Sequence, residues 1–76
     1  MSEHRLKILP EYFSLVRCGE KTFEIRRDDR GFEVGDVLNL EEYNGYEYTG
    51  QRVFVDVIYI TDYEQKEGFV VMGVRL

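Results

Sequence analysis

The chain changes from a helical to an extended pattern within one stretch, Gly19-Glu20-Lys21-Thr22-Phe23-Glu24-Ile25-Arg26. Glycine often follows the last turn of a helix, so Gly19 marks a predicted helix end. From Thr22 onward polar and apolar residues alternate, which predicts a strand with Glu24 and Arg26 on one face and Phe23 and Ile25 on the other. No other stretch concentrates so many charged groups, so the polar face is a candidate site.

The segment before this stretch predicts a strand and a helix. Residues 5–8 alternate polar and apolar side chains and predict a first strand. Leu9-Pro10 ends that strand, and proline is favoured in the first turn of a helix. The helix is predicted from about Pro10 to Cys18, because apolar residues follow at helical spacing, namely Tyr12, Phe13, Leu15 and Val16.

The rest of the chain reads as strands joined by short connections. Extended runs are predicted at residues 37–43, 52–61 and 69–74, with a charged loop at 27–31, a turn at 32–36 and a loop at 62–68. Asn44-Gly45 is the strongest hairpin signal, although Thr49-Gly50 competes for the turn. The pattern predicts an α+β, mostly β fold: a small, mostly antiparallel barrel of about five strands with one short helix after the first strand.

Size and composition predict a single domain over residues 1–76. A chain of 76 residues has a small core. Five Phe and six Tyr supply apolar area without a metal or a disulfide, and the expected core aromatics are Phe13, Phe23, Phe54 and Phe69. Cys18, the only cysteine, is expected as a small buried residue. No signal peptide and no apolar run of roughly 20 residues is found, which predicts a cytoplasmic protein without a membrane partner.

The net charge of −5 argues against indiscriminate binding of polyanions. The charge is unevenly distributed along the chain. Residues 1–30 carry seven basic and six acidic side chains, whereas residues 31–76 carry three basic and nine acidic ones. Any contact with phosphate is therefore expected through the first half, and the second half is expected to form an acidic exterior.

The spacing G-x-K-x-x-E-x-R at residues 19–26 resembles the signature of the ASCH domains, small β-barrels related to the PUA domain of RNA-modifying enzymes. Flanking stretches extend the resemblance over nearly the whole chain, namely His4-Arg5-Leu6-Lys7, Leu9-Pro10-Glu11-Tyr12-Phe13, Arg27-Asp28-Asp29-Arg30, residues 32–38, residues 59–62 and residues 68–73. Together they are similar to one short, often phage-associated ASCH-like family of uncharacterised function. The resemblance implies a PUA-like barrel and a role with nucleic acid.

Two interpretations of Glu24 and Arg26 predict opposite burial. On a solvent-facing strand the two side chains form an exposed ion pair worth under about 1 kcal/mol. On a concave barrel face Arg26 offers a planar donor to phosphate, and Glu24 accepts a hydrogen bond from the amino group of a base. The full set of expected binding residues is His4, Lys7, Lys21, Glu24, Arg26 and Arg27; His4 and Lys7 enter it through their family stretch.

Metal and cofactor chemistry are not expected. One His and one Cys without a second ligand pair do not make a zinc site, and the chain has neither a P-loop nor a G-x-G-x-x-G motif. Three tyrosines surround the predicted hairpin, and their packing across the strands is favoured over stacking on bases; they are Tyr43, Tyr46 and Tyr48.

Three function classes stay open, and binding of RNA or a nucleoside is the expected one. Some ASCH proteins are amidohydrolases of N4-acylated cytidine that use a Lys, a Thr and a Glu. By resemblance Lys21 matches that lysine, but Glu24 stands at the Thr position, and the loop at 62–68 is too short for the segment that carries the Glu. Hydrolysis of a modified nucleoside, with Lys21 and Glu24 as an acid–base pair, is the alternative. The third class is a phage or bacterial protein-interaction module. The sequence leaves the oligomeric state open.

Overall fold

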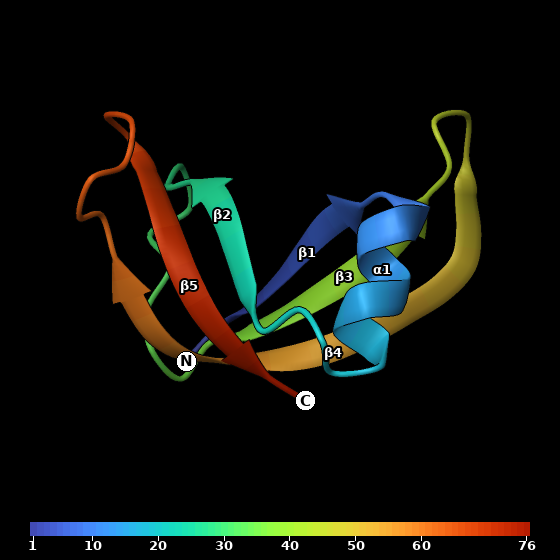
Figure 1. Ribbon diagram of the computed structural model, residues 1–76, viewed down its shortest axis with the longest axis horizontal. Coiled ribbons are helices and arrows are strands. Elements are labelled where there is room, and N and C mark those ends of the chain that lie inside the picture. Colours follow the sequence, from blue (N-terminus) through green and yellow to red (C-terminus); the bar gives the residue numbers. More distant parts are fainter.

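A computed structural model describes residues 1–76 as five strands and one helix. In chain order they are β1 (Glu3–Ile8), α1 (Pro10–Arg17), β2 (Phe23–Arg27), β3 (Val37–Tyr43), β4 (Tyr48–Thr61) and β5 (Phe69–Arg75). The predicted fold class is confirmed: the chain is mostly β, with one short helix after the first strand (Figure 1).

All strands form one curled sheet in the order β1-β3-β4-β5-β2. β1 runs parallel to β3, and the other neighbours are antiparallel. The 14-residue β4 pairs with β3 through its first half and with β5 through its second half, and its register with β5 shifts between Val57 and Tyr59. Such irregularities bend a strand, and the sheet curls into a half-barrel (Figure 1).

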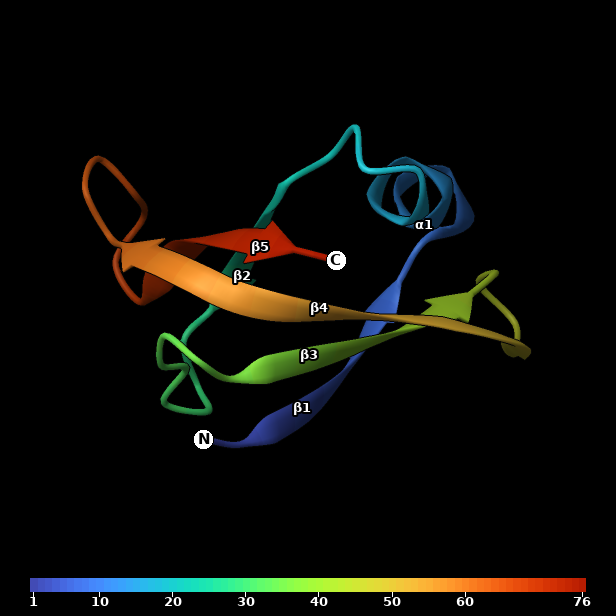
Figure 2. The ribbon, with the colours of Figure 1, turned by 90° about the horizontal axis from the view of Figure 1, so that it is seen from below.

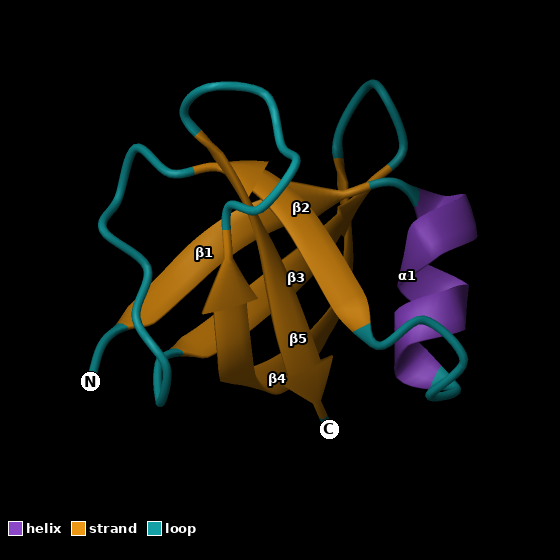
Figure 3. Cartoon of the chain, turned by 60° about the vertical axis from the view of Figure 1, so that its left-hand side comes forward, coloured by secondary structure: helices purple, strands orange, loops and turns teal.

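The two edge strands, β1 and β2, border the open side of this half-barrel. They are not neighbours in the sheet order, and side chains bridge them instead. Arg26 donates to the carbonyl oxygen of Lys7 at 2.9 Å, and Arg30 donates to that of Arg5 at 2.9 Å. In Figure 3 β2 lies in front of the other strands. We call the region between residues 3–8 of β1 and 23–27 of β2 the seam.

Apolar side chains from alternate strand positions fill the inner face of the half-barrel. The buried strand residues are Leu6, Ile8, Leu38, Leu40, Val55, Val57, Val70, Met72 and Val74. α1 packs on β3 and β4, and Figure 2 shows it end-on beside the strands. Of its four apolar residues at helical spacing, Phe13 and Val16 are 3% and 1% exposed, so these two side chains hold the helix against the sheet.

The ends of α1 follow the local sequence. The helix begins after Leu9 with Pro10 at its first position, and it ends at Arg17. Gly19 follows with a φ of +84°, which glycine adopts without steric cost. The predicted burial of Cys18 was wrong, because its side chain is exposed. Cys18 lies two residues after the buried Val16, a spacing that turns it to the opposite side of a helical turn.

The β3–β4 hairpin forms at Asn44-Gly45, as predicted, and not at Thr49-Gly50. The side-chain oxygen of Asn44 accepts hydrogen bonds from two backbone N–H groups of the turn at 2.9 and 3.0 Å. Tyr43 and Tyr48 pack edge-to-face across the strands with ring centroids 5.2 Å apart. Packing across the strands is thus confirmed for these two tyrosines, whereas the Tyr46 side chain is exposed.

β2 alternates as predicted, but its polar face is the buried one. Glu24 is 3% exposed and Phe23 is 44% exposed. Glu24 lies opposite the fully buried Met72 of β5, and residues opposite one another in a sheet point to the same face. The prediction of Phe23 as a core residue was therefore wrong, as was that of Phe54, which is 45% exposed on the outer face of β4. Phe69 is half-buried.

Candidate functional site

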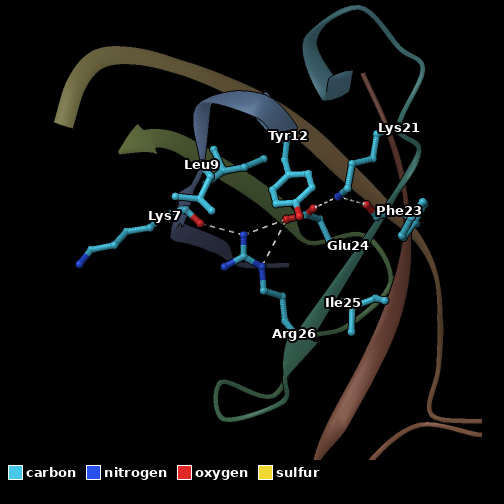
Figure 4. Close-up of a pocket in the computed structure, with 9 residues that line it drawn as sticks. Lys7, Leu9, Tyr12, Lys21, Phe23, Glu24, Ile25 and Arg26 are labelled. Carbon is cyan, nitrogen blue, oxygen red and sulfur yellow. Dashed lines mark hydrogen bonds and ion pairs between the residues drawn. The ribbon is translucent and has the colours of Figure 1, made fainter. Parts of the chain in front are cut away.

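A buried carboxylate, Glu24, forms ion pairs with two cations at the seam. Its Oε2 bonds to the ammonium group of Lys21, and its Oε1 accepts from Nη2 and Nε of Arg26 at 2.8 and 3.3 Å (Figure 4). The side chains of Lys21 and Arg26 are 15% and 25% exposed. The structure thus brings three predicted site residues together on the concave face, as the second of the two interpretations requires.

Local geometry holds the three side chains in place. Glu24 and Arg26 are two residues apart on β2 and so share one face. Lys21 lies in the turn that follows α1, where its backbone N–H donates to the carbonyl oxygen of Leu15 at 3.0 Å. Its ammonium group also donates to the carbonyl oxygen of Phe23 at 2.7 Å. The end of the helix therefore fixes Lys21 beside the first residues of the strand.

A cavity of about 440 Å³ opens at these three residues. It is lined by Lys7, Ile8, Leu9, Tyr12, Lys21, Phe23, Glu24, Ile25 and Arg26. Tyr12 points from α1 toward Glu24 (Figure 4), and the Lys21 ammonium lies 4.8 Å from the centroid of the Phe23 ring. Tyr12 was predicted only as one of the apolar residues at helical spacing, not as a lining residue. A mostly apolar cavity with a few convergent polar groups is the usual form of a small-molecule site.

The polar groups of the cavity keep unused hydrogen-bonding capacity. An ammonium group has three N–H donors, and Lys21 uses two of them within the protein. Arg26 uses Nε and Nη2, and its third nitrogen points away from Glu24 in Figure 4. A carboxylate accepts about four hydrogen bonds, so Oε2 of Glu24, bonded only to Lys21, keeps an acceptor position. The cavity can therefore both donate to and accept from a ligand.

The other predicted site residues are placed differently. Lys7 lines the cavity and its backbone oxygen binds Arg26, but its ammonium group lies 4.5 Å from the Tyr43 ring centroid. Arg27 does not line the cavity; its guanidinium group lies 4.9 Å from the centroid of the Phe69 ring. His4 also lies outside the cavity, since it is bonded to a residue of the turn before β3.

That residue is Asp36, a buried carboxylate that the sequence analysis placed only in a turn. Its oxygens accept hydrogen bonds from the backbone N–H groups of Ser2 and Glu33 at 2.9 and 3.0 Å, and Oδ2 lies 2.8 Å from Nε2 of His4. The hydrogen bond to His4, followed by the one from Ser2, lowers the pKa of Asp36 from 3.8 to about 2. Asp36 and His4 therefore anchor the start of β1 and do not extend the cavity.

Metal-ligating side chains do not gather elsewhere in the chain. No three His, Cys, Asp or Glu residues form a group that can hold a metal ion. Cys18 lies at the end of α1, where its sulfur contacts the carbonyl oxygen of Leu15 at 3.5 Å, whereas His4 is on β1.

α1 is eight residues long, and it lacks the length and apolar character needed to cross a membrane.

The sequence is similar to a phage protein and matches a named family. A protein of Escherichia phage P2, described as an uncharacterized 12.9 kDa protein in the GpA 3′ region, is 39% identical to this chain over 59 residues. The match covers 78% of this chain and 54% of the phage protein, so the chain spans about half the length of that relative. The family described as a domain of unknown function, DUF3850, matches residues 3–74. The protein therefore belongs to the DUF3850 family.

Proposed function

We propose that the cavity at the seam binds RNA or a nucleoside by enclosing one base. The observation that carries this proposal is the Glu24 carboxylate, which is 3% exposed in a cavity that also contains the aromatic rings of Tyr12 and Phe23. Aromatic side chains stack on unpaired bases, and a carboxylate accepts a hydrogen bond from the exocyclic amino group of a base. The resemblance to the ASCH domains and their PUA-like barrel supports the same class of ligand. A protein that binds RNA or a nucleoside in this way would act in the cytoplasm.

The charged groups have separate roles in this proposal. Glu24 selects the base, because Oε2 keeps an acceptor position. Lys21 and Arg26 balance the charge of Glu24 and fix its rotamer from two sides. Each also keeps a donor for an oxygen of the base, the ribose or the phosphate, contacts that position a ligand more than they specify it.

The alternative activity, hydrolysis of an acylated nucleoside, receives less support from the same geometry. The residue at the position of the family's nucleophilic Thr is Glu24, and both of its oxygens are bonded to cations. Thr22 is no substitute, since it lines a different cavity beside the end of α1. The segment 62–68 contains no helix that can carry a further catalytic Glu. Misplacement of a reacting group by about 1 Å can cost about a hundredfold in rate.

Binding titrations with the four ribonucleosides and a short single-stranded RNA test the proposal. Lys21→Ala and Arg26→Ala should weaken RNA binding, and each should make the dependence of log affinity on log salt shallower by up to about 0.7, the share of one phosphate contact. Glu24→Gln should change which base is preferred, because an amide both donates and accepts hydrogen bonds. Lys66→Ala is the matched control: Lys66 is exposed in the 62–68 loop and lines none of the cavities described.

Melting curves of every variant separate loss of binding from loss of the fold. Equal affinities of the wild type, Lys21→Ala and Arg26→Ala proteins for RNA would refute the proposal. Incubation with N4-acetylcytidine should leave that nucleoside intact. Its deacylation by the wild type, abolished by Lys21→Ala and Glu24→Gln, would replace binding with hydrolysis as the function. Absence of affinity for every nucleoside and RNA would favour the third class, a protein-interaction module.

A further inference from the structure

A second cavity, of about 470 Å³, continues along the seam from the first and shares Lys7 and Arg26 with it. Its lining is Arg5, Leu6, Lys7, Arg26, Arg30, Glu41 and Tyr48. Four of these side chains are cationic and one is acidic, so the lining residues alone carry a formal charge of +3 in a chain of net charge −5. Glu24 and Asp29, which pair with Arg26 and Arg30, lie outside this lining. Such a concentration of positive charge in an otherwise acidic protein raises the local concentration of anions.

Two guanidinium groups in this cavity are held by the free edge of β1. Arg26 reaches across the seam from β2 to the carbonyl oxygen of Lys7, and Arg30 reaches from the following loop to that of Arg5, both at 2.9 Å. These two oxygens belong to alternate residues of an edge strand and so point to the same side. The arginines are therefore ordered at neighbouring points before any ligand arrives, which reduces the entropy lost on binding.

Both of these arginines keep donors that the protein does not use. Arg30 forms one hydrogen bond, through Nη1, and its Nε lies 3.9 Å from the Asp29 carboxylate in an exposed ion pair, which leaves Nη2 without a hydrogen bond to the protein. Arg26 leaves Nη1 unused. Arg5 differs, because Nε and Nη2 bind Glu41 at 2.8 and 3.2 Å and that carboxylate balances most of its charge.

We infer that the second cavity is a phosphate subsite, in which Arg26 and Arg30 bind the phosphate of a nucleotide whose base occupies the first cavity. Arginine suits this ligand because its planar donor fork matches the oxygens of a phosphate. The inference rests on the proposed function for the base. It assigns the phosphate to Arg30, which is not among the binding residues expected from the sequence, in place of Arg27, whose guanidinium group lies over Phe69.

Binding of matched ligands tests this assignment at constant ionic strength. Each ribonucleoside is compared with its 5′-monophosphate, and inorganic phosphate alone is titrated against the arginine Nε–H signals in NMR spectra. For the nucleoside that binds, the affinity of its 5′-monophosphate should be higher by about tenfold or more. Arg30→Ala should remove most of that gain and change nucleoside affinity by less than about twofold. Arg17→Ala is the matched control, since Arg17 is on α1, bonded to Gln51, and lines neither cavity.

The possible failures are distinguishable. A nucleoside that binds as tightly as its monophosphate would overturn the phosphate subsite and leave the proposed function standing. Phosphate that shifts the Arg26 and Arg30 signals, without binding of any nucleoside or nucleotide, would support the subsite and refute the proposed function. Equal loss of phosphate binding in Arg17→Ala and Arg30→Ala would show a diffuse charge effect and overturn the subsite. Tighter binding of an oligoglutamate peptide than of any nucleotide would overturn the choice of ligand.

Discussion

Glu24 and Asp36 are both buried, and different groups compensate the two carboxylates. Glu24 is paired with Lys21 and Arg26, whose side chains reach the solvent at the seam. Asp36 instead accepts two backbone hydrogen bonds and one from His4, and these tie the first residues of β1 to the turn before β3. A buried carboxylate without partners is costly. The first arrangement leaves charged groups facing a cavity, whereas the second encloses the carboxylate and serves the fold.

Protonation of Asp36 should make the protein less stable in acid. Its pKa in the folded chain is about 2, below the ordinary 3.8, so its contribution to stability is complete above about pH 4 and is lost as the pH falls toward about 2. Asp36→Asn should lower the melting temperature at neutral pH and flatten its dependence on pH in this acidic range. Thermal melts across the range check this, with the exposed Asp56→Asn as control. Melting temperatures that fall equally with decreasing pH in the wild type and in Asp36→Asn would contradict this role of Asp36.

The conformational preferences of single residues explain which helix and turn boundaries the sequence predicts well. Pro10 and Gly19 delimit α1, and Asn44-Gly45 forms the turn of the β3–β4 hairpin. These three features are predictable because they depend on the local sterics of the backbone. The alternation of β2 predicts a strand but not which face turns inward. Which face turns inward depends on the pairing of β2 with β5, a strand far along the chain from it, and on the curl of the sheet. The sequence alone therefore does not determine whether Glu24 is buried.

The attachment of α1 should depend on Phe13. The helix has eight residues, too few to persist without tertiary contacts, and Phe13 is 3% exposed. Phe13→Ala is expected to cost about 3–5 kcal/mol of unfolding free energy through lost burial and the cavity left behind. Leu15→Ala on the same helix, at 38% exposure, should cost under about 1 kcal/mol. Urea unfolding measures both, and equal midpoints for the two variants would place the packed face of α1 elsewhere.

Both cavities lie along the seam, where the sheet does not close. Every lining residue of these two cavities except Glu41 and Tyr48 belongs to the first 30 residues, the part of the chain in which the sequence shows its excess of basic groups. The sequence could therefore indicate the half that carries the charge. It could not place Arg30 beside Arg5, because that contact spans the seam between two strands that never pair. Charged side chains on edge strands also discourage pairing with other chains.

The seam should be visible in backbone hydrogen exchange. The Thr22 carbonyl accepts from the N–H of Val74 in β5, and the Asp28 N–H donates to the carbonyl of Gly68, just before β5. The backbone groups of odd-numbered residues between them, such as Ile25, therefore point the other way, and the Ile25 N–H is directed to the seam. Exchange at Ile25 should therefore be fast, whereas Leu38 and Val55, paired and buried on the central strands, should exchange near the rate of global unfolding.

Saturating single-stranded RNA should slow exchange at Ile25 and leave the exposed hairpin residue Tyr46 unchanged, because a ligand at the seam shields only that edge. Exchange followed by NMR with and without the RNA measures both effects. Protection of Ile25 equal to that of Val55 in the free protein would show that β1 and β2 pair in solution. The half-barrel would then be closed, and the cavities would lose the opening through which a base could enter.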